Sequence, residues 1–550
     1  MSFNSIEFAV LLVITYLLYR VLSLRGQNTL LLSASYIFYG WWNVKLLYLI
    51  VLSTVIDFVC GAMIDVGWLS KQNRRLISVV LVLAAVLFDT LQWQAVQLSL
   101  LPLTIAVNWV DLVPNTWSGW WVLAATVPFV AIANFLYSRS AQLEEARRRT
   151  LFLVLSVVAN LSILGIFKYA NFFTNSVVDG FRWLGLEADS ITLNLILPIG
   201  ISFYTFKAIS YAVDIYRGRL HASHHFWDFA LFWVYFPPLL AGPIDRASHL
   251  LPQLTHRRHL SFQQTSDGIF LILFGLFKKV AIADGVASSV NAVYQTTGAL
   301  SWLDIVAATV LYALQIYAGF SGYFDIGRGV SKLFGIELML NFNLPYFSKT
   351  PSEFWERWHI SLSSWLRDYL YIPLGGSRHG TFNTYRNLMI TMLLGGLWHG
   401  AAWNFILWGG YQGTLLCGYR VLSKTERRSD DVVSFRKRLA SILAIAIFFG
   451  LTCYGWLLFR ATSLEQIVTF TRLLIVDFGN LSLGMPKPPL SALLGIPLLV
   501  GYECLEYFTR TSKVALWVPT PLRAALYATL ILILIMGESN APVQFIYSQF

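Results

Sequence analysis

TPSEFWERWHISLSSWLRDYLYIPLGGSRHGTFNTYRNLMITMLLGGLWHGAAWNFILWGGYQG, residues 350–413, places two histidines, His359 and His399, in apolar surroundings. The opening residues Thr350-Pro-Ser-Glu353 have the pattern of a capping box with proline at the first helical position. Apolar residues then recur every three or four positions, which predicts an amphipathic helix that ends before Pro373. Because His359 falls beside this apolar stripe, we expect it to face protein or lipid rather than bulk water.

The composition is that of a membrane protein. Apolar residues make up 56% of the 550 residues and charged residues only 13%, whereas a typical soluble domain has about 25% charged residues. Apolar runs close to the roughly 20 residues that a helix needs to cross a bilayer core recur from end to end. These features predict an all-α polytopic membrane protein without a large soluble domain. The first run, residues 6–24, lacks a preceding basic region, so we expect it to be retained as a span.

The net charge of +11 does not indicate a nucleic-acid partner, because the basic residues are dispersed in short loops. One such loop carries Arg139 and Arg147-Arg-Arg149, and another extends from Arg420 to Arg438. Basic residues accumulate in cytoplasmic loops of membrane proteins. We therefore assign both loops to the cytoplasm and expect membrane lipid, but no nucleic acid, around this chain.

The apolar runs predict a long series of spans with several interruptions. The expected spans lie at residues 5–24, 29–42, 46–64, 76–91, 98–109, 120–136, 151–167, 269–282, 305–324, 388–398, 403–419, 439–458, 493–507 and 522–536. Residues 179–189 are polar and are expected to form a loop, and Lys278-Lys279 should interrupt the span that contains it. Asp57 lies within the third span, where a carboxylate needs an internal partner or a function; we favour a structural partner.

Three stretches are expected to be irregular at membrane depth. Residues 197–206 contain Pro198 and Gly200, which indicates a broken segment lining an internal chamber or, equally, a kinked helix. Residues 226–242 are interrupted by Pro237-Pro238 and are expected to form a re-entrant segment. Residues 341–387 carry too many charges, prolines and glycines for a simple span, so they should lie at the interface or dip inward.

No sequence pattern for a metal or disulfide site is present. The four cysteines lie in or beside apolar segments and contain no C-x-x-C pair. Six further histidines occur in polar loops without the H-E-x-x-H spacing of a zinc site: His221, His224, His225, His249, His256 and His259. We therefore expect no metal.

His399, in Trp398-His-Gly400, is the leading catalytic candidate. An ionisable side chain between long apolar runs is a functional hypothesis by default, although a histidine paired with one backbone carbonyl is the structural alternative. Burial disfavours the charged imidazolium, which would leave the neutral ring available as a general base. The glycine pairs Gly396/Gly400 and Gly409/Gly413 have the G-x-x-x-G spacing that permits close helix contact.

The chain lacks a G-x-S-x-G elbow, a Walker loop and a dinucleotide fingerprint. Histidine-assisted chemistry or transport therefore remains. A transporter or flippase would also have broken helices, but we find no inverted repeat that would favour it.

Motifs spread over nearly the whole chain carry a family resemblance. They are Tyr39-Gly-Trp-Trp-Asn43, Phe167-Lys-Tyr169, Leu197-Pro-Ile-Gly-Ile-Ser-Phe-Tyr-Thr-Phe206, Ala241-Gly-Pro243, Gly322-Tyr-Phe-Asp325, Asn341-Phe-Asn343-Leu-Pro-Tyr346, Phe354-Trp-Glu-Arg-Trp-His-Ile-Ser-Leu-Ser363, Tyr371-Ile-Pro-Leu-Gly-Gly376, Leu397-Trp-His-Gly400 and Gly455-Trp-Leu-Leu-Phe-Arg460. With these motifs the chain resembles the membrane-bound O-acyltransferase (MBOAT) family, and most closely its bacterial branch that acetylates exopolysaccharides such as alginate.

The resemblance implies a bundle of many transmembrane helices around a central funnel in the bacterial inner membrane. It identifies His399 as the catalytic histidine and His359 as the second active-site position, with Arg357, Trp358, Trp398 and Asn404 as substrate-binding candidates. Acetyl-CoA would be the donor on the cytoplasmic side, and a hydroxyl would be reached from the outer side. An extracytoplasmic acetyltransferase and a polysaccharide synthesis complex are the partners it implies.

The resemblance also divides the chain into three parts. Residues 1–150 would hold N-terminal helices, with an insertion near 76–136, residues 151–425 the catalytic core, and residues 426–550 the C-terminal helices. D-alanyl transfer to teichoic acid by the same fold is the alternative activity, although the continuation through Arg460 favours the polysaccharide branch.

Overall fold

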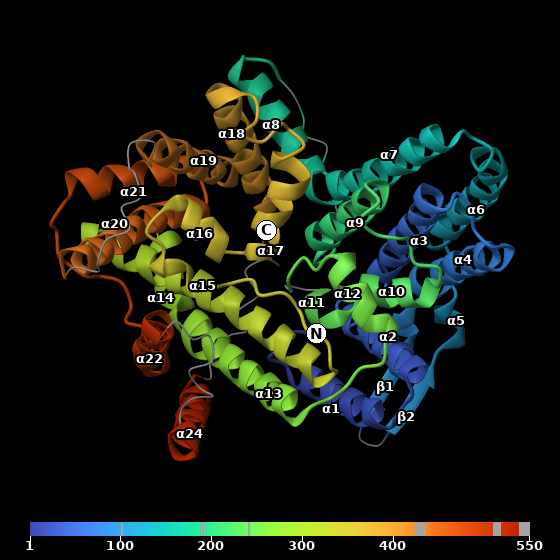
Figure 1. The fold of residues 1–550 in the computed structure, drawn as a ribbon, viewed down its shortest axis with the longest axis horizontal. Helices are drawn as coiled ribbons and strands as arrows, with labels where there is room; N and C mark the ends of the chain where they lie inside the picture. The colour runs from blue at the N-terminus through green and yellow to red at the C-terminus, as the bar shows by residue number, and fades with distance from the viewer. Residues whose placement is uncertain are drawn as a thin grey trace.

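The computed structural model describes residues 1–550 apart from 101–102, 188, 190–191, 194, 240–241, 297, 424–434, 510–518 and 538–550. The described chain is predominantly helical. Figure 1 shows the N-terminal helices in one half of the molecule and the C-terminal helices in the other, with α15 (Trp302–Leu333) and α16 (Pro351–Arg357) between them.

The N-terminal half has helices at the first three expected spans, of which α3 is long and apolar enough to cross a membrane, and it corrects a later one. The helices here are α1 (Ile6–Val21), α2 (Leu24–Gly40), α3 (Leu46–Asp65), α4 (Lys71–Ala84) with the π-helical η1 (Ala85–Thr90), and α6 (Trp121–Ser140). The span expected at 98–109 is wrong: β1 (Val96–Leu100) pairs antiparallel with β2 (Leu103–Val107). Gln97 and Ser99 alternate with apolar neighbours, which is the two-residue period of a strand. Short turns η2 (Trp93–Ala95), α5 (Trp109–Leu112) and η3 (Trp117–Gly119) flank this hairpin.

A continuous helical segment follows, composed of α7 (Glu145–Leu164), the π-helical η4 (Gly165–Tyr169) and α8 (Ala170–Trp183). The loop expected at 179–189 is therefore wrong in its first part. An i, i+3 ion pair of 3.8 Å between Asp179 and Arg182 lies on this last helical turn. The charged residues there lie on the exposed last turn of the helix and do not terminate it.

The two proline- and glycine-containing segments are both irregular. Helix α9 (Ile201–Tyr216) starts only after Gly200, whose φ of 77° is left-handed, so the kinked-helix alternative is wrong. A Cβ on Gly200 would meet the Leu239 carbonyl oxygen at 2.6 Å, which leaves room only for glycine. Helix α10 (Phe226–Val234) has 9 residues, too few to cross a bilayer core. Together with the buried α11 (Phe236–Leu239), it agrees with the expected re-entrant segment.

The middle of the chain supplies the longest helix. After α12 (Ala247–Thr255), α13 (Phe262–Leu276), η5 (Phe277–Asp284) and α14 (Gly285–Tyr294) run continuously. Lys278 and Lys279 lie in the π-helical η5 and pair with Asp325 and Asp284, so the expected interruption is a change of helix type. Helix α15 extends over 32 residues and begins with a capping box at Ser301.

The stretch 350–372 is not one helix, as the apolar periodicity predicted. After η6 (Pro345–Phe347), α16 starts at the expected capping residue Thr350 but ends at Arg357; α17 (Ile360–Leu366) and the π-helical η7 (Arg367–Tyr371) follow. The remaining helices are α18 (Gly380–His399), α19 (Trp403–Ser423), α20 (Phe435–Arg460), α21 (Leu464–Val476), α22 (Leu490–Thr509) and α24 (Thr520–Met536). Sequence inspection missed α21. Lys424, Arg427 and Arg428 of the second basic loop lie outside the described residues.

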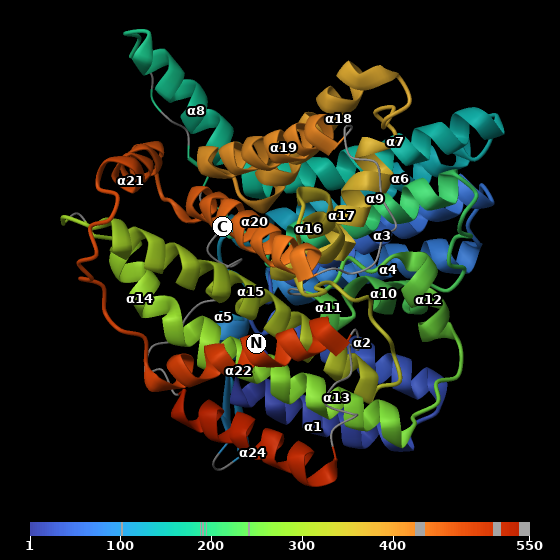
Figure 2. The same cartoon turned by 60° about the vertical axis from the view of Figure 1, so that its left-hand side comes forward.

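Helices α18 and α19 pack closely side by side (Figure 2). A Cβ on Gly396 would meet the Phe405 carbonyl oxygen at 2.2 Å, and one on Gly409 would meet the Met392 carbonyl oxygen at 2.3 Å. A Cβ on Gly413 would meet the Met389 sulfur at 2.8 Å. The predicted role of these glycines in helix contact is confirmed, because backbone lies where side chains would otherwise be.

Polar pairing inside the N-terminal half follows the expectation for Asp57. Its carboxylate accepts hydrogen bonds from Ser156 Oγ at 2.6 Å and Asn160 Nδ2 at 2.9 Å, and Asp57 is 1% exposed. Asp57 therefore has structural partners on α7.

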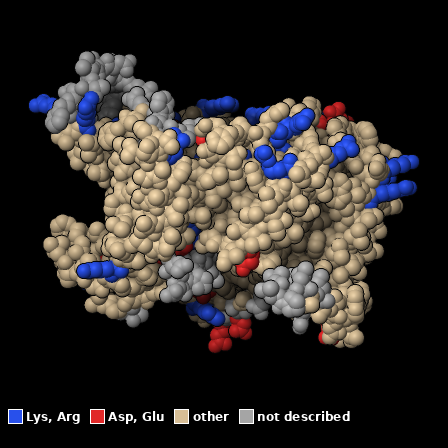
Figure 3. All heavy atoms as spheres, turned by 90° about the horizontal axis from the view of Figure 1, so that it is seen from below, with Lys and Arg blue, Asp and Glu red and all other residues tan. Residues whose placement is uncertain are grey.

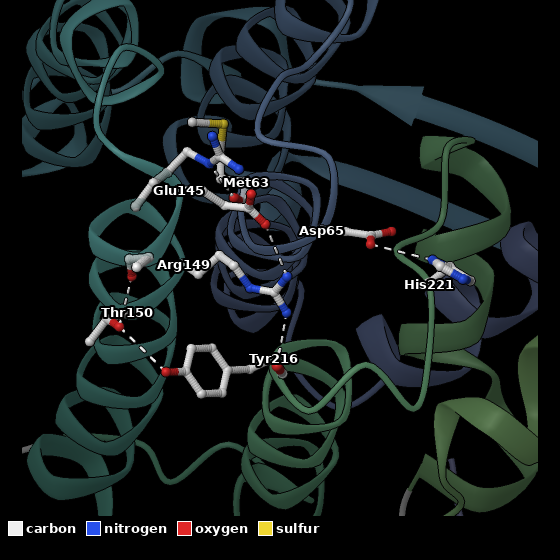
Figure 4. A network of polar contacts seen from close by, with 9 residues as sticks. Met63, Asp65, Glu145, Arg149, Thr150, Tyr216 and His221 are labelled. Atoms are coloured by element: carbon white, nitrogen blue, oxygen red, sulfur yellow. Dashed lines mark hydrogen bonds and ion pairs between the residues drawn. The ribbon is translucent and has the colours of Figure 1, made fainter.

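The ends of α3, α7 and α9 meet at one edge of the fold. In Figure 4, Arg149 of α7 reaches the Tyr216 carbonyl of α9 at 2.9 Å, while Asp65, at the end of α3, lies 3.3 Å from His221. The carboxyl ends of α3 and α9 therefore lie on the same side as the basic amino end of α7.

Six helices in the described part of the chain are long and apolar enough to cross a membrane. The visible lysines and arginines in Figure 3 lie mainly along one side of the molecule, above a broad surface almost without charge. This distribution is that of a multi-pass membrane protein.

Candidate active site

His399 is the last residue of α18, where the helix ends in an extended Gly400. The imidazole is enclosed by aromatic rings, with centroid distances of 4.9 Å to Trp398, 5.1 Å to Trp408 and 5.4 Å to Phe459. His399 is 5% exposed. The ring therefore faces protein; the apolar sequence around it predicted its burial.

His359 lies in the break between α16 and α17, with φ of 45° and ψ of 54°. This left-handed conformation costs a non-glycine residue roughly 1–2 kcal/mol. Asn341 holds the break open for it: its carbonyl accepts the Ile360 N–H at 2.9 Å, and its Oδ1 accepts the Ser361 N–H at 2.8 Å. These bonds replace helical ones, which is why the predicted continuous helix does not form.

The His359 ring is buried without a polar partner. Phe203, Phe324 and Phe342 surround it at centroid distances of 6.2, 5.7 and 6.2 Å, and the residue is 2% exposed. Neither ring nitrogen has a hydrogen-bond partner among the described residues. Buried polar atoms are nearly always paired, so the two ring nitrogens are available to a water molecule or a ligand.

Trp398 connects the two histidines. Its ring lies 6.0 Å from the His359 ring and 4.9 Å from the His399 ring, edge-on to both. Its indole N–H donates to the Ser202 carbonyl at 3.4 Å, at the start of α9. The structure thus brings the two histidines and Trp398 into one aromatic cage, built by α9, α15, α18, α19, α20 and the break before α17.

The other binding candidates lie around this cage with partners of their own. Trp358 is 3% exposed and packs 4.8 Å from the Trp456 ring. Arg357 forms a 2.8 Å ion pair with Glu353, and its second terminal guanidinium nitrogen donates a hydrogen bond to the Asn343 carbonyl at 3.3 Å. Asn404 donates to the Phe459 and Ala461 carbonyls at 3.1 and 3.0 Å, which ties α19 to the end of α20. Their proposed contact with substrate remains a prediction.

Sequence inspection did not assign roles to several cage residues. Asn341 and Lys168 occur in the quoted motifs, and only their contacts reveal what they do. Phe203 lies in the predicted chamber-lining stretch and also borders a cavity of about 20 Å³, together with Tyr204, Lys207 and Asp245. A volume of this size holds one or two water molecules. Neither histidine lines this cavity, so the funnel that would deliver substrates remains a prediction.

Two buried imidazoles beside one indole ring are suited to acid–base chemistry. One ring can accept a proton from a nucleophile while the other donates a hydrogen bond to a developing negative charge. In a multi-pass helical bundle, a histidine-assisted group transfer is the chemistry that this arrangement suits; the catalytic role of the two histidines stays a prediction.

Comparison with known proteins gives the family. The model of the MBOAT, membrane-bound O-acyltransferase family, matches residues 215–459. The chain is 40% identical to the probable alginate O-acetylase AlgI of Pseudomonas aeruginosa over 71% of this chain and 74% of that protein. It is 36% identical to the probable alginate O-acetylase AlgI of Azotobacter vinelandii over 92% and 85% of the two chains. It is also 35% identical to a peptidoglycan O-acetyltransferase of Helicobacter pylori over 62% and 68%.

The chain belongs to the membrane-bound O-acyltransferase family, and it is an acyltransferase. The D-alanyl alternative has weaker support. The teichoic acid D-alanyltransferase of Bacillus subtilis is 29% identical over 48% of this chain and 69% of that protein. It is therefore a more distant relative than the O-acetylating proteins.

Proposed function

We propose that this acyltransferase moves an acetyl group from acetyl-CoA to a hydroxyl for the O-acetylation of an exopolysaccharide such as alginate. The relatives from Pseudomonas aeruginosa and Azotobacter vinelandii, both named as probable alginate O-acetylases, support the acetyl group and the polymer. The single observation that carries the chemistry is the pair of buried imidazoles on the Trp398 ring.

His399 acts as the general base in this proposal. It removes the proton from the acceptor hydroxyl as the oxygen attacks the thioester carbonyl carbon. The carbon–sulfur bond then breaks, and the same proton passes to the departing thiolate, so that atoms and charge balance. A positioned base of this kind contributes about 10²–10⁴-fold to a rate.

His359 stabilises the tetrahedral oxyanion. A neutral imidazole carries one N–H donor, and no described residue engages the His359 ring nitrogens. A donor that is already free of protein partners can meet the oxyanion without breaking another bond. Donors aimed at such an oxyanion are usually the largest single electrostatic contribution to acyl transfer.

The sidedness follows from the basic loops. Arg149 and the Tyr216 end of α9 meet at the edge that carries the basic Arg147-Arg-Arg149 sequence, which would be cytoplasmic. Ser202, next to the cage, lies about 21 Å along α9 from Tyr216 at 1.5 Å per residue. The cage would thus be deep in the inner membrane, where a cytoplasmic thioester can meet an alcohol from outside. An extracytoplasmic acetyltransferase and a polysaccharide synthesis complex would use the product.

The proposal is tested in bacterial cells that make the polymer. A strain with His399→Ala should lose polymer O-acetylation while the protein keeps its normal membrane abundance. His259→Ala is the matched control, since His259 lies in an exposed loop, and it should acetylate normally. Unchanged acetylation in the His399→Ala strain contradicts the proposal.

A further inference from the structure

Lys168 lies where three of the sequence motifs meet. Its ammonium group donates to the Trp398 carbonyl at 2.6 Å, to the His399 carbonyl at 3.2 Å and to Ser202 Oγ at 3.2 Å. Phe167-Lys-Tyr169, the start of α9 and Leu397-Trp-His-Gly400 therefore converge on one side chain, across 231 positions of sequence.

These contacts provide hydrogen-bond donors for the carbonyl groups at the end of α18. The last four carbonyls of a helix have no partner within the helix. Lys168 binds those of Trp398 and His399, and the Tyr169 hydroxyl donates to that of Leu397 at 3.0 Å. Three of the four unpaired carbonyls at the catalytic end of α18 are thus paired by two adjacent residues.

A lysine side chain suits this set of three oxygen acceptors. An ammonium has three N–H donors and no acceptor, and Lys168 meets three oxygen acceptors. The carboxyl end of a helix carries partial negative charge, which favours a cation. Within the part of the chain that the structure describes, no carboxylate forms an ion pair with Lys168, so its charge is directed at the helix end.

The local backbone presents this side chain. Lys168 belongs to η4, a π-helical turn within the otherwise α-helical α7 to α8 segment. Such turns occur frequently at functional sites. The extra residue of the π turn places Lys168 and Tyr169 together on the side that faces α18.

We infer that Lys168 is a positioning residue for the acyl transfer: it fixes the backbone of Trp398 and His399, and thereby the direction in which the His399 imidazole points. This inference rests on the proposed function. The hydrogen bonds of Lys168 go to the protein, and two of them reach the carbonyls of Trp398 and His399, so it acts through His399. A displacement of about 1 Å in a catalytic group can lower a rate about 10²-fold.

The experiment uses the full-length protein purified in detergent, with acetyl-CoA and an oligosaccharide acceptor, and measures thiol release. Lys168→Met retains the side-chain length but has no donor. It should lower kcat about 10²-fold, with the KM for acetyl-CoA changed by less than about twofold because donor binding does not involve this residue. The thermal midpoint is measured on the same preparation, and kcat is expressed per monodisperse protein.

Lys207→Met is the control, because Lys207 is a buried lysine that also donates to a backbone carbonyl, that of Phe232. It should retain the kcat of the wild type. Equal kcat losses in the two variants, or an unchanged kcat in Lys168→Met, would overturn the positioning role. A wild-type protein that releases no thiol would instead refute the proposed function.

If the Lys168→Met protein does not accumulate, Lys168→Arg tests the positioning role instead. Arginine keeps the charge, but its planar fork does not match three acceptors grouped around one nitrogen. Its kcat should fall by at least about tenfold with KM unchanged. A wild-type kcat in Lys168→Arg would contradict the inference.

Discussion

His399 and His359 both contact the Trp398 ring, but the backbone conformation differs between them. His399 ends a regular helix whose carbonyls are paired by Lys168 and Tyr169, whereas His359 occupies a left-handed break held by Asn341. The rigid helix end suits a base that must point in one direction. The break suits a donor whose ring nitrogens have no hydrogen-bond partner in the described part of the chain. The difference teaches that the two histidines depend on different supports, which can be removed separately.

The largest effect is expected from the helix pair that carries His399. In Gly409→Leu, the new side chain would collide with the backbone of α18, because a Cβ at this position would lie only 2.3 Å from the Met392 carbonyl oxygen. The helices must then separate, at a cost of about 3 kcal/mol. The folded protein should be lost from the membrane, as measured by size-exclusion profiles of detergent extracts.

Gly418→Leu is the control for this prediction, because nothing lies within 4 Å of a Cβ at Gly418 on the same helix. It should accumulate like the wild type. Equal accumulation of both leucine variants would show that close approach of α18 and α19 is not required.

His359→Gln tests the second histidine without removing its volume. If the ring donates to the oxyanion, kcat should fall by about 10²–10³-fold, as it does when one oxyanion donor is removed from other enzymes. Steady-state thiol release with acetyl-CoA measures the change. A kcat equal to that of the wild type would restrict the chemistry to His399.

Removing the support of His359 should have a smaller effect. Asn341→Ala leaves the buried Ser361 N–H without its acceptor, which costs about 1–3 kcal/mol. The thermal midpoint should fall, and the activity should fall with it because the break relaxes. Asn383→Ala, which deletes an exposed side-chain bond to His379, should leave both unchanged. An unaltered midpoint in Asn341→Ala would mean that other contacts hold the break.

The smallest effect concerns the backbone of the break itself. His359→Gly and His359→Ala both remove the imidazole, but only glycine adopts the left-handed conformation freely. The glycine variant should therefore be more stable than the alanine variant by roughly 1–2 kcal/mol. Comparison of their thermal midpoints checks this, and the reverse order would contradict the left-handed backbone at this position.

The two histidines also show what the sequence could and could not predict. The burial of His399 followed from the long apolar runs around it, and the close helix pair followed from the glycine spacing. The break at His359 was missed because Phe354, Leu362 and Trp365 keep the helical period on both sides of it. The residue that opens the helix, Asn341, is 20 positions from Ser361, and local periodicity contains no information about such a contact.

Other errors have the same physical origin. Hydropathy alone cannot distinguish a short apolar hairpin from a span, which is why β1 and β2 were mistaken for a helix. Lys168 was visible in a motif, but its partner carbonyl on Trp398 lies 230 positions away. Long-range hydrogen bonds assemble this site, and these bonds appear only once the chain is folded.

Thiol release from acetyl-CoA by the purified protein, supplied with an oligosaccharide acceptor, tests the central claim most directly. His399→Gln should reduce the rate by at least about 10²-fold, while His259→Gln, in an exposed loop, retains the rate of the wild type. A His399→Gln protein that releases thiol and acetylates the acceptor at the wild-type rate would contradict the account.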